Sequence, residues 1–163
     1  MIERLERCEG ETARAVLTSD SPERTADIGR CLGRVVPPGT VFSLEGGLGV
    51  GKTVMVGGIC SGLGIEGDVL SPSFILVEEY RGDLPVLHFD LYRLEEMHEV
   101  EELGLYEAVD GRNVIIVEWG DRLPEGALQP DVRLVLRITG TERREIAVEA
   151  CGGVIGVLRR SGW

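Results

Sequence analysis

The sequence predicts an α/β fold in a single domain, and three features of its pattern lead to that prediction. An apolar stretch, Val41–Leu44, runs directly into a glycine-rich segment and then into a helical pattern, as in a strand–loop–helix unit. A second apolar run, Val114–Val117, has no polar interruption, which is typical of a central strand buried on both faces. Residues Val132–Ile138 alternate between apolar and polar, turn at Thr139–Thr141, and alternate again through Val148. We therefore expect a mixed, partly antiparallel sheet flanked by helices.

The first 40 residues contain one clear helix. Residues 1–20 carry little pattern beyond a short expected strand at Ala13–Leu17. Ser21 followed by Pro22 predicts a helix with Ser21 as its N-cap, and apolar residues at Ile28 and Leu32 lie on one face of it until Gly33.

A second helix follows the glycine-rich segment, because apolar residues recur at helical spacing through Leu63. Gly57 and Gly58 each cost this helix about 1 kcal/mol relative to Ala. We expect close packing of the helix on the sheet to offset that cost.

The middle of the chain predicts a hairpin and an acidic helix. Ile75–Tyr80 and Val86–Asp90 read as two strands joined by a short turn at residues 81–84. Glu95–Leu103 predicts an acidic helix facing solvent, and Leu105–Val109 predicts a second short helix.

Composition limits the class of protein. At 163 residues with 43% hydrophobic content, the chain is long enough for one globular core. Its apolar runs are far shorter than the roughly 20 residues of a membrane span, and Met1–Arg4 does not resemble a signal peptide. The four cysteines are scattered without a C-x-x-C pair, which favours reduced thiols. We expect a soluble, cytoplasmic protein, and the net charge of −11 opposes direct binding of nucleic acid.

Gly46–Thr53, with the sequence GGLGVGKT, matches the phosphate-binding pattern G-x-x-x-x-G-K-[ST] in full. Glycines let the backbone N–H groups surround phosphate oxygens, and the following helix adds the positive end of its dipole. Lys52 supplies a point charge for the β- and γ-phosphates, and the Thr53 hydroxyl is placed to ligate Mg²⁺. Lys52 is also the only Lys among 17 basic residues, which indicates a role that a guanidinium group does not fill.

A magnesium–nucleotide site also needs carboxylates at strand ends close to this loop. Glu118 directly follows the apolar run Val114–Val117, and Asp90 ends the strand that begins at Val86. The alternative interpretations are an exposed strand-end acid for Glu118 and a helix cap for Asp90. His88 and His98 are interpreted as structural or solvent-exposed, and Trp119 fits either the core or the site.

Five segments of the chain carry a resemblance to a known family. They are Gly46–Thr53, Ser71–Tyr80, His88–Leu94, Glu101–Leu105 and Val117–Trp119. Together they resemble the TsaE family, small bacterial ATPases of the tRNA threonylcarbamoyladenosine pathway. Their order and spacing agree from about Ser21 to Arg144, whereas residues 1–20 and 151–163 find no match. Three positions depart from the usual family pattern: Gly47 in place of Asp, Ser73 in place of Thr, and Gly120 in place of Pro.

The resemblance implies an ATPase that uses ATP with Mg²⁺ and works with transferase partners similar to TsaB and TsaD. By position, Lys52, Asp90 and Glu118 are the expected catalytic residues, and Thr53 and Glu118 the expected metal ligands. Ser71–Ser73 is expected to sense the nucleotide, with Thr25 near the base. The expected nucleotide-binding residues are Thr25, Gly46, Gly47, Leu48, Gly49, Val50, Gly51, Lys52, Thr53, Val54, Ser71 and Ser73.

Three other functions share a phosphate-binding loop. A small-molecule kinase usually carries an Arg-rich lid, whereas residues 95–102 are acidic. A GTP switch would need an N-K-x-D segment, which a chain whose single Lys is Lys52 does not contain. A nucleotide-binding scaffold without hydrolysis stays open, because no residue is an obvious general base for water.

Overall fold

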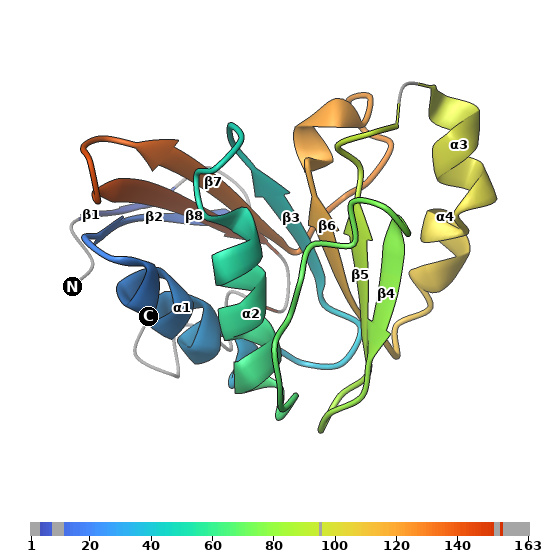
Figure 1. Ribbon diagram of the computed structural model, residues 1–163, viewed down its shortest axis with the longest axis horizontal. Coiled ribbons are helices and arrows are strands. Elements are labelled where there is room, and N and C mark those ends of the chain that lie inside the picture. The colour runs from blue at the N-terminus through green and yellow to red at the C-terminus, as the bar shows by residue number, and fades with distance from the viewer. Residues whose placement is uncertain (1–3, 8–11, 95, 152–153, 155–163) are drawn as a thin grey trace.

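Strand β3 lies inside an eight-stranded mixed sheet with the order β1-β2-β8-β7-β3-β6-β5-β4 (Figure 1). The computed structural model describes residues 4–7, 12–94, 96–151 and 154. In chain order the elements are β1 (Arg4–Arg7), β2 (Thr12–Ser19), α1 (Pro22–Gly33), β3 (Val41–Glu45), α2 (Lys52–Gly62), β4 (Val77–Tyr80), β5 (Val86–Asp90), α3 (Met97–Glu102), α4 (Leu105–Ala108), β6 (Val114–Glu118), a 3₁₀ turn η1 (Gly120–Arg122), β7 (Val132–Ile138) and β8 (Arg144–Cys151).

The sheet is parallel in the middle and antiparallel at both sides, so the predicted mixed α/β fold is confirmed. Strand β3 pairs in parallel with both β6 and β7, and β5 pairs in parallel with β6. Strands β4, β8, β2 and β1 join antiparallel. All five residues of β3 and of β6 are buried, as the uninterrupted apolar run in β6 predicts.

Two hydrophobic cores cover the two faces of the sheet. Helices α1 and α2 pack on one face, where Leu32 and Ile59 join Phe42 and Ile116. Helices α3 and α4 lie over the other face beside β5 and β6 (Figure 1), where Val100 and Leu105 join Ile115. None of the helices in the described ranges is long and apolar enough to cross a membrane.

The N-terminal residues contribute more structure than their weak pattern predicts. Strand β2 extends from Thr12 to Ser19 rather than from Ala13 to Leu17, and it pairs along its whole length with β8. Strand β1 was not expected. The chain between Thr12 and Ser19 is therefore part of the sheet, joined to it by the C-terminal hairpin.

Two further boundaries differ from the sequence prediction. Strand β4 begins at Val77 rather than Ile75, because the N–H groups of Ile75 and Leu76 both donate to the Pro72 carbonyl in a turn. Helix α3 begins at Met97, where a capping box formed by Glu96 and Glu99 starts it; residue 95 lies outside the described residues.

Gly58 and Gly62 of α2 pack against helix α1 and not against the sheet, so the expectation of close packing on the sheet was wrong. A Cβ atom at Gly58 would collide with the Ala26 carbonyl of α1, and one at Gly62 with the Arg30 carbonyl. In the reverse direction, Gly33 of α1 abuts the Ile59 carbonyl. The two helices approach so closely that their backbones touch at glycine positions, and this packing offsets the low helix propensity of glycine.

Gly58→Ala should therefore lower the free energy of unfolding by about 1–3 kcal/mol, since the added methyl group meets backbone that cannot move aside locally. Gly57→Ala is the matched control. Its Cβ would have the Val69 side chain as its nearest neighbour, at 3.9 Å. Gly57→Ala should therefore raise the free energy of unfolding by up to about 1 kcal/mol, through the higher helix propensity of Ala. Urea denaturation of both variants checks this, and equal effects would contradict the packing argument.

Candidate functional site

The Gly46–Thr53 loop connects the end of β3 to the start of α2, and its backbone requires glycine at key points. Gly51 is the N-cap of α2 and has a φ of 109°. Gly46 has a φ of 132°, and a Cβ there would collide with the Leu136 carbonyl of β7. The loop therefore turns tightly between β7 and α2, with the N-terminus of an 11-residue helix directed at it.

Lys52 is held inside the loop by two backbone carbonyl groups. Its Nζ donates to the carbonyl oxygens of Gly46 and Gly47, at 2.7 and 2.9 Å, and lies 3.6 Å from the centroid of the Trp119 ring. Burial lowers the pKa of the Lys52 ammonium, while the charges of Glu118, Asp121 and Asp90 act in the opposite direction and raise it.

Trp119 reaches Lys52 through an uncommon backbone conformation. Its φ is 62°, a left-handed value that costs energy in a bulky residue. The Tyr92 ring lies against the indole, with 4.9 Å between the ring centroids. The sequence left Trp119 open between core and site, and the structure places it beside the loop cation.

Glu118 and Thr53 meet at the carboxyl end of the parallel strands. The Thr53 hydroxyl lies 3.1 Å from Oε1 and 3.3 Å from Oε2 of Glu118, and the Glu118 side chain is almost fully buried. The interpretation of Glu118 as an exposed strand-end acid is therefore wrong. The two expected metal ligands are brought together across α2 and β6.

Asp90 lies beside Glu118, because the two residues are register partners in the parallel pair β5 and β6. Its Oδ2 accepts hydrogen bonds from the hydroxyls of Ser71 and Ser73, the latter at 2.6 Å. Its Oδ1 accepts the Tyr92 N–H at 2.9 Å. The Ser71–Ser73 loop is thus tied to a buried carboxylate at the strand end.

These groups surround a cavity of about 390 Å³. Most of the expected nucleotide-binding residues lie on its wall or in the loop that borders it. Thr25 does not: it is buried in α1, with its hydroxyl 2.7 Å from that of Ser19. The cavity is lined by Leu48, Gly49, Gly51, Lys52, Thr53, Val54, Ser71, Ser73, Asp90, Tyr92, Glu118 and Trp119.

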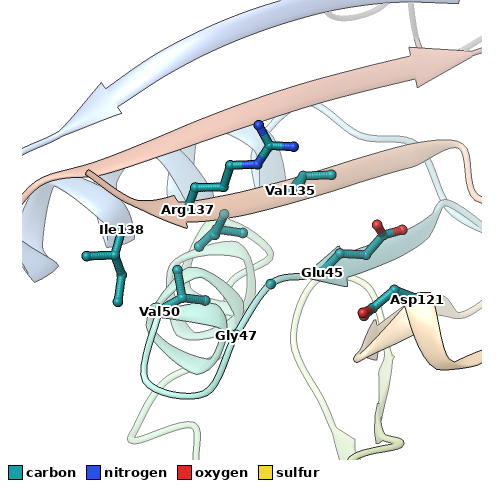
Figure 2. A pocket seen from close by; sticks show the side chains of 9 residues that line it. Glu45, Gly47, Val50, Asp121, Val135, Arg137 and Ile138 are labelled. Atoms are coloured by element: carbon teal, nitrogen blue, oxygen red, sulfur yellow. The ribbon is translucent and has the colours of Figure 1, made fainter. Parts of the chain in front are cut away.

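A second hollow of about 400 Å³ lies on the β7 side of the same loop (Figure 2). Glu45, the last residue of β3, borders it together with Asp121 and Arg137. The Glu45 carboxylate accepts two hydrogen bonds from Arg133 of β7, at 2.6 and 2.5 Å, and these bonds raise the pKa of Arg133. This paired ionic contact fixes the strand end from which the loop departs.

The sequence did not single out Glu45, Arg133 or Tyr92, and it assigned no part in the site to His88. His88 is fully buried, with Nε2 3.0 Å from Oε1 of Glu118. A signal was present: His88 lies two residues before Asp90 in a strand, so both side chains point to the same face of the sheet. His98, in contrast, is exposed and close to Glu96.

The donor set fits Mg²⁺ bound together with a nucleotide. No group of three or more His, Cys, Asp or Glu side chains in the described ranges could hold a metal by itself. One hydroxyl and one carboxylate at Thr53 and Glu118 are oxygen donors of the kind that hold Mg²⁺ when phosphate oxygens and water complete its coordination. The Lys52 ammonium and the amides of the loop and helix fit the phosphates.

Known proteins share this sequence pattern and fold. The sequence model of the family described as "Threonylcarbamoyl adenosine biosynthesis protein TsaE" matches residues 19–146. The chain is 41% identical over 133 residues to the tRNA threonylcarbamoyladenosine biosynthesis protein TsaE of Bacillus subtilis (strain 168), a match that covers 81% of this chain and 83% of the relative. It is 38% identical over 130 residues to the protein of the same name from Treponema pallidum (strain Nichols), covering 80% and 96%.

A solved structure extends the likeness to nearly the whole chain. The crystal structure of Bacillus subtilis YdiB matches with a TM-score of 0.77 at 30% sequence identity, covering 98% of this chain and 97% of that one. Both the fold and the sequence between residues 19 and 146 agree with these relatives, and the chain belongs to the TsaE family.

Proposed function

We propose that this chain is the ATP-binding and ATP-hydrolysing subunit of the machinery that makes tRNA threonylcarbamoyladenosine, and that it acts with transferase partners of the TsaB and TsaD kind. Its relatives are named as biosynthesis proteins for that modification. The observation that carries the ATPase part is the contact between Thr53 and Glu118 beside the phosphate-binding loop.

In this proposal the residues of the cavity have separate roles in binding phosphate and metal. Lys52 exchanges the carbonyl oxygens of Gly46 and Gly47 for phosphate oxygens, a move that keeps its buried charge paired. Thr53 and Glu118 would hold Mg²⁺, which when bound would neutralise charge on the phosphate oxygens.

Asp90 is the group best placed to orient the attacking water, and the Ser71–Ser73 loop controls it. In the structure both Asp90 oxygens already accept hydrogen bonds, so the carboxylate has little capacity left for water. If the Ser71 and Ser73 hydroxyls turn toward a γ-phosphate, Oδ2 becomes free to accept a proton from water. The loop would then order differently with ATP and ADP, as switch loops do.

Apolar side chains at the cavity support a dependence on partners. Leu48 at the tip of the phosphate-binding loop is 73% exposed, and Phe74 and Ile75, directly after Ser73, are 82% and 61% exposed. Exposed apolar groups gathered around a site are typical of a surface that another protein covers. A partner docked here would contact the Ser71–Ser73 loop and so respond to the bound nucleotide.

We expect the transferase partners to bind this chain at least tenfold more tightly with ATP than with ADP, a difference of about 1.4 kcal/mol.

Labelled tRNA should bind the isolated chain weakly, because the net charge of −11 repels a polyanion over about 8 Å at physiological ionic strength. Two titrations at the same salt concentration measure these affinities, and ATPase assays with and without the partners test hydrolysis. Tight tRNA binding by the isolated chain, or partner affinity that does not depend on the nucleotide, would overturn the proposal.

A further inference from the structure

His88 is a buried polar side chain between the apolar layer under α2 and the carboxylates of Asp90 and Glu118 at the strand ends. It lies on β5 opposite Ile116 of β6, on the face of the sheet that packs against α2, and it is fully buried. Its Nε2 is 3.0 Å from Oε1 of Glu118, whereas its Nδ1 has no hydrogen-bond partner among the described residues. A buried polar ring is costly in such a place, so the hydrogen bond to Glu118 calls for an explanation.

The surroundings of the two ring nitrogens place the hydrogen. An ionised carboxylate can only accept, so Nε2 must carry the hydrogen that bridges it to Glu118. A hydrogen on Nδ1 would be buried without an acceptor, at a cost of about 1–3 kcal/mol. The arrangement therefore selects the Nε2–H tautomer, which donates to Glu118 alone.

We propose that His88 is a positioning residue for the metal site: it holds the Glu118 carboxylate by one oxygen and so fixes the direction of the other. The proposal rests on the proposed role of Glu118 as a Mg²⁺ ligand. Glu118 has several rotatable bonds, and its described neighbours on the cavity side offer only the Thr53 hydroxyl as a direct donor. The Thr53 hydroxyl is itself an expected metal ligand. His88 Nε2 is the donor that stays bonded to Glu118 when the metal binds.

The test compares two side chains of similar shape. His88→Met fills the space without a donor, and His88→Gln keeps an N–H group at a similar reach. With a non-hydrolysable ATP analogue present, Mn²⁺ binding is measured by electron paramagnetic resonance. We expect His88→Met to weaken Mn²⁺ binding about 10- to 100-fold, as loss of an outer partner of a metal ligand commonly does. His88→Gln should restore the affinity to within a few-fold of the wild type.

Two further measurements separate positioning from a general structural role. Affinity for the analogue in EDTA should be unchanged in His88→Met, since the phosphate-binding loop is intact. In a double-mutant cycle, His88→Met should add little to the loss already caused by Glu118→Gln, because it acts through that carboxylate. His88→Phe, which keeps a ring without a donor, repeats the comparison in the event that His88→Met does not fold.

The outcomes also separate this inference from the proposed function. If Glu118→Gln leaves Mn²⁺ affinity unchanged, the proposed role of Glu118 as a metal ligand is overturned, and the inference about His88 with it. If Glu118→Gln weakens Mn²⁺ binding but the donor-free His88 variants bind as tightly as the wild type, only the inference about His88 is overturned. Equal losses in the Met and Gln variants would likewise overturn it, because the hydrogen bond would then not be the cause.

Discussion

Lys52→Ala should reduce ATP affinity about 100-fold or more, because hydrogen bonds to charged groups contribute about 1.5–3 kcal/mol each and Lys52 is the cation held inside the loop. Lys52→Arg should not restore binding. The ammonium occupies a confined position between two loop carbonyls and the Trp119 ring, which the longer, planar guanidinium does not fit.

Isothermal calorimetry with ATP measures this effect. Arg81→Ala is the matched control for loss of a positive charge. The Arg81 side chain is 88% exposed, and it lies in the turn between β4 and β5, at the opposite end of β5 from Asp90. We expect the control to bind ATP as the wild type does. Wild-type affinity in Lys52→Ala would show that the nucleotide site lies elsewhere.

Loss of Glu118 or Asp90 should separate binding from hydrolysis. Glu118→Ala removes the expected carboxylate ligand, and we expect Mg²⁺-dependent turnover in the active complex to fall by orders of magnitude. Asp90→Ala should have a similar or milder effect, in the range of about 10²–10⁴-fold that a general base commonly contributes. Nucleotide binding should largely survive in both, because neither residue is part of the phosphate-binding loop.

Steady-state ATPase assays and calorimetry on the same preparations give the two quantities. Ser71→Ala serves as a comparison for Asp90→Ala, since it removes a donor to Oδ2 without removing the carboxylate. If both carboxylate variants hydrolyse ATP at the wild-type rate within the complex, the metal and water-orienting roles are wrong.

The elements that the sequence predicts well are those whose signal is local. Ser21 and Pro22 mark the start of α1, where the Ser21 hydroxyl accepts the Arg24 N–H, and the apolar run in β6 marks a buried central strand. The start of β4 is set by the turn in which Ile75 and Leu76 donate to Pro72, which the apolar pattern does not show. The packing of Gly58 depends on a contact with another helix. No local pattern of Gly58 shows that the carbonyl of Ala26, in another helix, is its neighbour.

The same distinction applies to the candidate site. A loop pattern identifies Gly46–Thr53 directly, and strand ends identify Asp90 and Glu118, which the structure brings beside it. The bond from His88 to Glu118 joins two strands whose pairing the sequence does not state, and Arg133 reaches Glu45 from a strand late in the chain. Side chains that support a site from neighbouring strands become visible only when the order of the strands is known.

The position of β3 between β6 and β7 has a consequence for how the protein folds. Ser43 pairs with Val117 on one side and with Arg133 on the other, so the strand before the phosphate-binding loop gains its neighbours only when distant parts of the chain have closed on it. Such long-range parallel pairing is slow to form, because chain entropy is lost before the contacts compensate for it. We therefore expect the cavity beside Lys52 to be completed late in folding. A ligand that binds only the completed cavity should slow unfolding and leave the folding rate nearly unchanged.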